Sequence, residues 1–240
     1  MAGVSPVLRA RLAGVFYVLT GGTAFAVLVR GKVIVGGDAA ATAHNILAAE
    51  GLYRLGLAAD IVGVASYAVV TVLLYGLLRP VNPSLALLAA FFSLVGVATQ
   101  AVSSVADFVP LIVLGGAHYL AVFDAGQLQA VALTSLQIHG VGFGVALVFF
   151  GFYCALLGYL IFASSFFPRI LGVLVSIAGL ALLTNSFTTF LAPEFAHAVA
   201  PVMLGLDGLG ELSLMLWLLV IGVNGAKWEA TASRRILPSS

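Results

Sequence analysis

Long apolar runs separated by short polar stretches dominate the pattern along the chain. Runs bounded by charge or proline lie at about residues 10–29, 55–78, 84–114, 128–162, 170–191 and 201–223. Each can cross the hydrocarbon core of a bilayer, which takes about 20 apolar residues in a helix. They must be helices, because backbone in lipid has to satisfy its own hydrogen bonds and the runs lack the alternation of a barrel strand. The pattern therefore predicts an all-α, polytopic bundle of about six transmembrane helices.

The connection between the first two runs, residues 31–54, has a helical pattern of its own. Asp38 or Thr42 is suited to be the N-cap of a helix whose apolar positions follow at Ile46, Leu47 and Leu52. Glu50 and Arg54 are spaced for an ion pair one helical turn apart. We predict a short helix on the outer face. Beyond the last run, residues 224–240 form a polar tail.

The distribution of Lys and Arg predicts an orientation. With six spans, both termini and the turns at 79–83 and 163–169 share one side of the membrane, whereas Arg30, Lys32 and Arg54 lie on the other side. Cytoplasmic segments carry the excess of basic residues, so both termini are expected in the cytoplasm. The cations on that side are Arg9, Arg11, Arg79, Arg169, Lys227, Arg234 and Arg235.

Composition supports the membrane prediction and excludes several functions. The chain of 240 residues is 62% hydrophobic and 8% charged, which is too little charge for a soluble domain. The net charge of +1 gives no basis for binding nucleic acid. Cys154 is the single cysteine, so an intrachain disulfide and a cysteine-based zinc cluster are both excluded. The run from Leu12 to Val29 is long enough for a retained first span rather than a cleaved signal.

The polar residues inside the predicted spans gather at one depth. Counted from the cytoplasmic end of each helix, they lie about 20 to 35 Å up, in the outer half of the bilayer or at its outer surface. Buried ionisable groups are costly in lipid, so we expect them to face one another or a wet cavity. The predicted outward-facing pocket is lined by Asp60, Gln100, Asp107, His139, Asn185, Asp207 and Glu211, with His44, Asn45, Glu50 and Arg54 as its lid.

Two groups within this set could carry chemistry. Asp207 and Glu211 are one helical turn apart, so they could share a proton, bind a cation or pair with Arg54 or His139; alternatively, Asp207 only caps the last helix. His139 with Asp107, Glu211 or Asp60 could act in acid–base catalysis or bind Zn, Mn or Fe. No His-x-x-x-His spacing supports a metal, and an interhelical hydrogen bond is the alternative for His139. No cofactor is predicted.

Glycines recur on one face of the fourth run, at Gly140, Gly144, Gly151 and Gly158. Such a stripe of small residues is typical of a helix that packs closely against a neighbour in the membrane. We therefore interpret it as a packing surface rather than a site.

An ordered set of motifs resembles a known family. The motifs are Arg11-Leu-Ala-Gly14, Gly37-Asp-Ala-Ala-Ala-Thr42, Asn45-Ile46, Leu77-Leu-Arg-Pro-Val-Asn82, Phe149-Phe-Gly151, Pro168-Arg-Ile-Leu-Gly172, Gly210-Glu211 and Leu216-Trp-Leu-Leu219. Together, over about Ala10 to Asn224, they resemble the bacterial membrane proteins of the domain of unknown function 4386 (DUF4386) family. The resemblance implies a six-helix protein of the bacterial plasma membrane and supplies no activity, cofactor or catalytic residue.

The sequence leaves three functions open. The first is a binding protein or membrane-embedded enzyme for a small ligand or ion, with His139 as acid, base or ligand and Glu211 or Asp107 as its carboxylate partner. The second is a proton-coupled secondary transporter that uses Asp60, Asp207 or Glu211. The third is an accessory subunit, in a homo-oligomer or a membrane complex, whose polar layer only joins helices. The bilayer is the expected partner in each.

Overall fold

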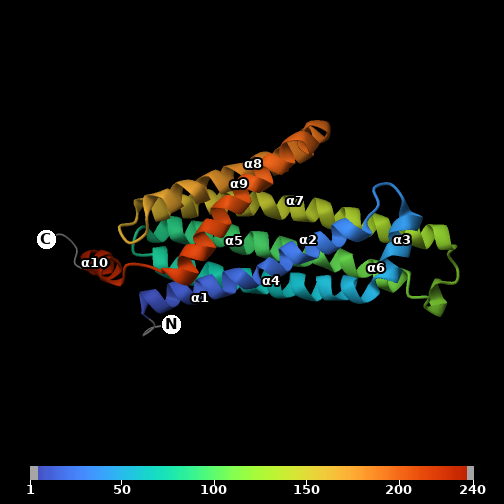
Figure 1. The fold of residues 1–240 in the computed structure, drawn as a ribbon, viewed down its shortest axis with the longest axis horizontal. Coiled ribbons are helices and arrows are strands. Elements are labelled where there is room, and N and C mark those ends of the chain that lie inside the picture. Colours follow the sequence, from blue (N-terminus) through green and yellow to red (C-terminus); the bar gives the residue numbers. More distant parts are fainter. Residues whose placement is uncertain (1–4, 237–240) are drawn as a thin grey trace. The chain divides into compact units, whose positions relative to one another are not determined.

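The computed structural model describes residues 5–236, and side chains up to residue 234. The regular elements of this part of the chain are helical (Figure 1). They are α1 (Pro6–Leu19), α2 (Gly21–Val33), α3 (Ala39–Ala48), α4 (Glu50–Leu78), α5 (Pro83–Ser104), the 3₁₀ turn η1 (Val105–Phe108), α6 (Val109–Val113), the 3₁₀ turn η2 (His118–Leu120), α7 (Ala125–Ala163), α8 (Arg169–Leu191), α9 (Pro193–Val220) and α10 (Gly225–Ile236).

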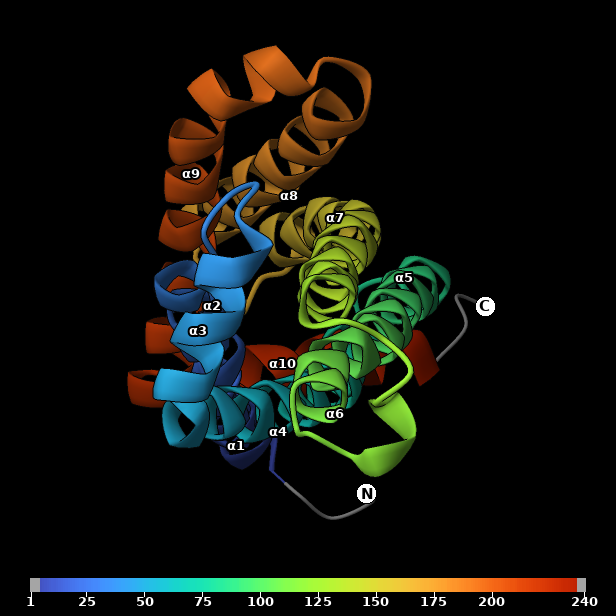
Figure 2. The ribbon, with the colours of Figure 1, turned by 90° about the vertical axis from the view of Figure 1, so that its right-hand side faces the viewer.

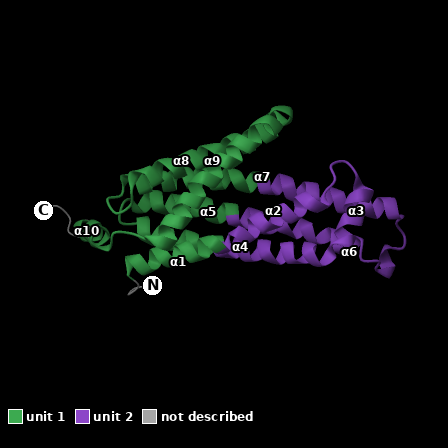
Figure 3. Ribbon diagram, in the orientation of Figure 1, with its two compact units in different colours: residues 1–18, 67–96, 144–240 green, residues 19–66, 97–143 purple. Residues whose placement is uncertain are grey.

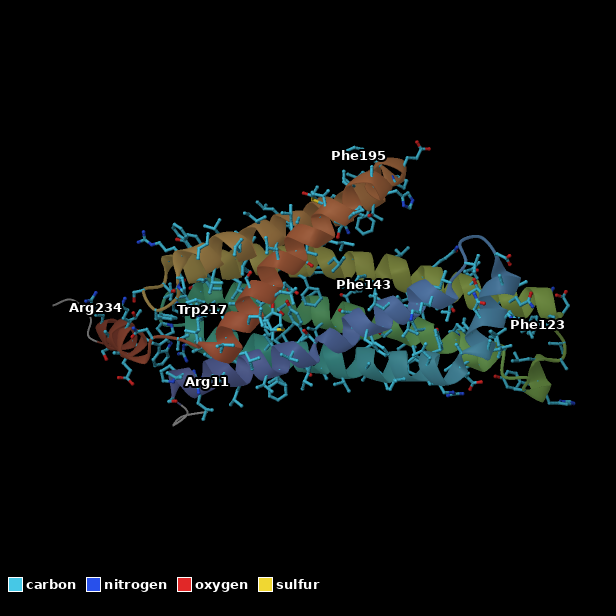
Figure 4. The ribbon with its side chains drawn as sticks, viewed as in Figure 1. Arg11, Phe123, Phe143, Phe195, Trp217 and Arg234 are labelled. Carbon is cyan, nitrogen blue, oxygen red and sulfur yellow. The ribbon has the colours of Figure 1, made fainter. Side chains whose placement is uncertain are left out.

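Within the described residues, six helical segments are long and apolar enough to cross a membrane, which confirms the predicted all-α fold with about six spans. The first span comprises α1 and α2, and the third comprises α5, η1 and α6. Large apolar side chains cover their surfaces: only 17% of the most apolar window of Pro193–Val220 is buried, and Phe195 projects from α9 with 59% of its surface exposed (Figure 4). Lipid is the solvent that such a surface requires.

The short helix predicted between the first two spans is α3, and Asp38 rather than Thr42 caps it. The Asp38 carboxylate accepts a hydrogen bond from the Ala41 N–H at 2.8 Å, and the Thr42 hydroxyl instead donates to the Val35 carbonyl at 3.2 Å. The ion pair between Glu50 and Arg54 is present at 2.7 Å, but both residues belong to the first turn and a half of α4. The second span therefore begins at Glu50, whereas the apolar run begins at residue 55.

The chain divides into two compact units by contact (Figure 3). Unit 1 comprises residues 1–18, 67–96 and 144–240, and unit 2 comprises residues 19–66 and 97–143. The helices α4, α5 and α7 each contribute one part to unit 1 and another to unit 2.

In unit 2, the third span is interrupted by the 3₁₀ turn η1, which carries Asp107. Pro110 has no N–H, so it cannot donate to the Ala106 carbonyl as an α-helix would require. The Val109 N–H donates to that carbonyl instead, which tightens the helix over Val105–Phe108. The apolar pattern alone predicts one continuous helix through this region. Pro110, which follows the 3₁₀ turn Val105–Phe108, explains why the α-helix is interrupted there.

In unit 2, the α2 part of the first span packs closely against α4. The span breaks at Thr20, ahead of Gly21 and Gly22, so α2 starts a new helix. A Cβ atom at Gly63 would lie 2.7 Å from the Thr23 hydroxyl oxygen and 2.8 Å from its backbone nitrogen. Only glycine allows this approach, and it brings the N-terminal end of α2 beside α4.

Unit 1 is organised around α8, which forms a hairpin with α9 (Figure 2). A Cβ atom at Gly158 of α7 would lie 2.6 Å from the Gly172 carbonyl oxygen of α8, and one at Gly210 of α9 would lie 2.6 Å from the Leu174 carbonyl oxygen. Gly151 of the predicted stripe also faces the Gly179 carbonyl, whereas Gly144 faces only the Phe190 ring and Gly140 faces open space. Two of the four glycines therefore carry the close packing.

Candidate functional site

An ion-pair cluster made of residues from all four spans in unit 2 is the most polar part of its interior. The Arg30 guanidinium, at the end of α2, lies 2.6 Å from Asp107 Oδ2 in η1 and 3.9 Å from Asp60 Oδ2 in α4. His139 Nδ1, in α7, lies 3.3 Å from the same Asp107 oxygen. All four residues are at least nine-tenths buried, with Asp107 at 0% and His139 at 3% exposure. We call Arg30, Asp60, Asp107 and His139 the charge network.

Neutral side chains hold the two carboxylates in place. The Ser104 hydroxyl donates to Asp60 Oδ2 at 2.7 Å, and the Gln100 amide donates to Asp60 Oδ1 at 3.4 Å. The Tyr53 hydroxyl donates to the backbone carbonyl of Asp107 at 2.7 Å, which fixes the 3₁₀ turn against α4. Because these partners come from α4 and α5, the network joins the four spans rather than one helix pair.

The hydrogen bonds of His139 determine which ring nitrogen carries its proton. Nδ1 lies 3.2 Å from the Ser103 carbonyl oxygen as well as 3.3 Å from Asp107 Oδ2. Both neighbours are acceptors in the ionised network, so Nδ1 bears the proton and Nε2 is the nitrogen that can gain or lose one. The ring stacks against Phe143 on the same helix, which fixes its plane.

Charge balance is the main chemical property of the network. With both carboxylates ionised and His139 neutral, one guanidinium faces two negative charges. Buried charge in a low-dielectric interior is stable only when it is paired, so one further positive charge is needed. In addition, Asp107 Oδ1 is buried with no hydrogen-bond partner among the described residues. The arrangement therefore suits one exchangeable proton, on His139 or on a carboxylate.

Unit 1 contains a second group of polar side chains, centred on the half-buried Glu211 of α9. Its Oε1 accepts hydrogen bonds from the Tyr67 hydroxyl at 2.9 Å and the Tyr17 hydroxyl at 3.2 Å, and the Cys154 thiol lies 3.8 Å away. The rings of Tyr17 and Tyr67 meet edge to face at 5.8 Å. This group is a carboxyl held by three weak acids, with no ion pair to it among the described residues, so it differs in chemistry from the network of unit 2.

The predicted pocket residues thus fall into separate groups. The structure brings together Asp60, Gln100, Asp107 and His139, whereas Asn185, Asp207 and Glu211 belong to unit 1. The carboxylate partner of His139 is Asp107 and not Glu211. Asp207 is not at the start of its helix, because α9 begins at Pro193, and so it is no N-cap; one oxygen each of Asp207 and Asn185 is buried without a partner in the described part.

The predicted lid residues do not touch the charge network. Arg54 and Glu50 pair with each other, with Arg54 60% exposed, and His44 is exposed on α3. The Asn45 amide donates to the Val33 carbonyl at 3.3 Å, so it fastens α3 to the end of α2. Below it, α3 packs on a hydrophobic cluster that includes Ile46, Tyr53 and Leu136. The helix α3 is therefore packed over this part of unit 2.

Sequence reasoning missed Arg30, which is the central residue of the network. It counted Arg30 with Lys32 among the cations on the outer side of the membrane, because the apolar run ends at Val29. The helix continues to Val33, and within its last turn Lys32 is exposed whereas Arg30 is 8% exposed. A usable signal existed: Arg30 lies seven residues after Thr23 and eleven after Leu19, on the face that carries Ala26 and Val33.

The geometry gives no support to the metal site considered for His139, Glu211 and Asp107. Across residues 5–236 there is no group of three or more His, Cys, Asp or Glu side chains placed to hold a metal ion. The Arg30 guanidinium occupies the Asp107 oxygen nearest to His139, and Glu211 belongs to the other unit. The donors that remain beside His139 are too few for a metal.

The helical fold, the lipid-facing surfaces and the buried charge network define a multi-span membrane protein. The model of the Domain of unknown function (DUF4386) family matches residues 12–222, nearly the whole chain. The chain belongs to this family, as the motif resemblance indicated. Comparisons with curated proteins and with solved structures gave no match.

Proposed function

We propose that this protein is a proton-coupled membrane protein that binds a small ligand or ion, and that it acts as a secondary transporter. The observation that supports this most directly is the charge network, in which Arg30 faces both Asp60 and Asp107 beside the titratable ring of His139. A buried group of this composition changes its net charge by one when it gains or loses a proton. Such a change can drive the rearrangement of the helices that supply it.

Two interruptions of the spans support transport over a static role. The first span breaks at Thr20, and the third span breaks at η1, where Asp107 lies. Discontinuous helices beside buried charges are typical of the binding sites of secondary transporters, because the freed backbone can change its pairing as the site opens. In the orientation proposed from the basic residues, with both termini in the cytoplasm of a bacterial cell, the network lies in the outer half of the membrane.

Other functions would use the same residues differently. A binding protein or membrane-embedded acid–base enzyme would open the network to the outer side only. An accessory subunit, whether in a homo-oligomer or a complex, would keep it closed at every pH. Access to the network from each side of the membrane therefore distinguishes the three functions.

The single cysteine makes this access measurable. Cys154 is buried in unit 1, so Cys154→Ala gives a chain without thiols in which Ala106→Cys places one thiol beside Asp107. We expect this thiol to react with a membrane-impermeant methanethiosulfonate several-fold faster at a pH at which the network has lost its proton than at one at which it holds it. The reagent should reach the thiol from the outer side of the membrane at one of these pH values and from the inner side at the other. Labelling rates in right-side-out and inside-out vesicles measure both.

Two controls make the result interpretable. Ala40→Cys, exposed on α3, reports the ordinary effect of pH on thiol reactivity, by which all rates are corrected. Asp107→Asn, added to Ala106→Cys, leaves a single carboxylate opposite Arg30 and should abolish the remaining pH dependence. Access from one side alone would contradict transport and favour a binding protein or enzyme, and a thiol that never reacts would favour the accessory subunit.

A further inference from the structure

The C-terminal helix α10 and the turns beside it form a basic surface at one end of unit 1. The helix is held there by three contacts: the Trp228 indole donates to the Leu77 carbonyl at 2.8 Å, the Asn224 N–H donates to the Phe166 carbonyl at 3.3 Å, and the Thr231 and Ser165 hydroxyls lie 3.2 Å apart. These partners are the end of α4 and the turn between α7 and α8. The helix therefore covers the ends of the spans instead of extending away from them.

The same end also contains the beginning of α1. The Arg9 side chain packs on Gly76 near the end of α4, and Gly222 and Gly225 lie against Val7. The cationic residues of these segments are Arg9, Arg11, Arg79, Arg169, Lys227 and Arg234, and Glu229 is the one acidic residue among the described positions of the same segments. The distribution of charges along the sequence predicts that they share one side of a membrane, and the contacts of these segments place them at one end of unit 1.

The helix α10 presents two different faces. Trp228, Thr231 and Ala232 are half-buried and lie one turn apart, on the face that meets the spans. Lys227 and Arg234 are exposed. The helix has little apolar surface to insert into acyl chains, so its exposed side is suited to the headgroup layer, where tryptophan and basic residues concentrate.

We infer that this basic surface, formed by α10 with Arg11 and Arg169, binds the headgroups of anionic phospholipids in the adjacent leaflet. Positive charge without matching acidic residues attracts anionic lipid, and each Lys or Arg near the membrane surface contributes about fivefold in affinity. The hydrogen bond from Trp228 to the Leu77 carbonyl ties the helix to the end of α4. This inference is independent of the proposed transport.

Quenching of tryptophan fluorescence by brominated lipid tests the inference on the full chain. Both tryptophans lie at this end: Trp217 donates to the Gly222 carbonyl at the end of α9, and Trp228 is in α10. In phosphatidylcholine vesicles with a minor fraction of brominated phosphatidylglycerol, we expect several-fold more quenching than with the same fraction of brominated phosphatidylcholine. The ratio of quenching by brominated phosphatidylglycerol to quenching by brominated phosphatidylcholine should fall toward one at about 0.5 M salt, where charges are screened over a few Å.

Matched variants assign the effect to α10. Lys227→Gln with Arg234→Gln should lower the ratio of quenching by the two brominated lipids from several-fold to nearly one, and Glu229→Gln should preserve or increase the ratio. All three positions are exposed, so folding is retained and is checked by elution volume. Equal quenching by the two brominated lipids would overturn the inference, as would a double variant with an unchanged preference. Full competition by millimolar inorganic phosphate would also overturn it, because the surface would then bind small anions and not lipid.

Discussion

Replacing Arg30 by methionine is expected to lower the free energy of unfolding by about 3–5 kcal/mol, the usual cost of removing one partner from a buried ion pair. The substitution leaves the Asp60 and Asp107 carboxylates buried without their cation. Lys32→Met is the matched control, because it makes the same change of side chain in the same turn of α2 at an exposed position. That control should change the free energy of unfolding by no more than about 0.5 kcal/mol.

Reversible unfolding in mixed detergent and SDS micelles gives both values. Equal effects of Arg30→Met and Lys32→Met would contradict the burial of Arg30 and, with it, the charge network. The comparison is sharp because the two residues are two apart in the sequence, carry the same charge and lie at the same end of one helix.

The second large effect is expected at Gly158, where α7 packs on α8. A Cβ atom at this position would lie 2.5 Å from the Ser176 backbone nitrogen and 2.6 Å from the Gly172 carbonyl oxygen. Both are backbone atoms, so Gly158→Ala can be accommodated only if the helices move apart, at a cost of about 1–3 kcal/mol or more. Gly140→Ala, on the same helix with no atom within 4 Å, should instead stabilise the protein by up to about 1 kcal/mol, since alanine favours the helix.

The same unfolding assay measures this pair of variants, and the opposite signs are the result to look for. A neutral Gly158→Ala would show that the two helices are not packed backbone to backbone. A destabilising Gly140→Ala would show that this glycine also faces a partner.

The spans could be predicted from the sequence because the signal is an average over many residues. A run such as 170–191 has to be a membrane helix whatever it packs against, and the structure places α8 at Arg169–Leu191. The ends were harder to predict. The pattern predicts Pro201 as the start of the last span, but α9 begins about two turns earlier, with Pro193 at the first position and Glu194 in the first turn.

The candidate site could be predicted only in part, because depth along a helix can be counted but rotation about its axis cannot. Asp60, Gln100, Asp107 and His139 converge as expected of residues at one depth. Glu211 and Asp207 were assigned to the same pocket on depth alone, yet the face of α9 that carries Glu211 meets Tyr17 and Tyr67 in unit 1. A helix that is apolar on nearly every face has little amphipathic pattern, so the sequence of α9 gives no signal from which that face could be chosen.

Arg30 was missed for a related reason. A cation just beyond an apolar run is normally at the membrane surface, and Lys32 follows that rule. Arg30 departs from it because two carboxylates on other helices neutralise it, and such partners can be recognised only once the helices are placed together.

A double-mutant cycle between Arg30 and Asp107 tests most directly whether the polar side chains of unit 2 act as one charge-balanced network. The unfolding free energies of Arg30→Met, Asp107→Asn and the double variant are compared with wild type, alongside the same cycle for the exposed pair Arg54 and Glu50. We predict a coupling of about 2–3 kcal/mol for the buried pair and of about 0.5 kcal/mol or less for the exposed pair. Additive effects at Arg30 and Asp107 would contradict the network and the proton coupling proposed from it.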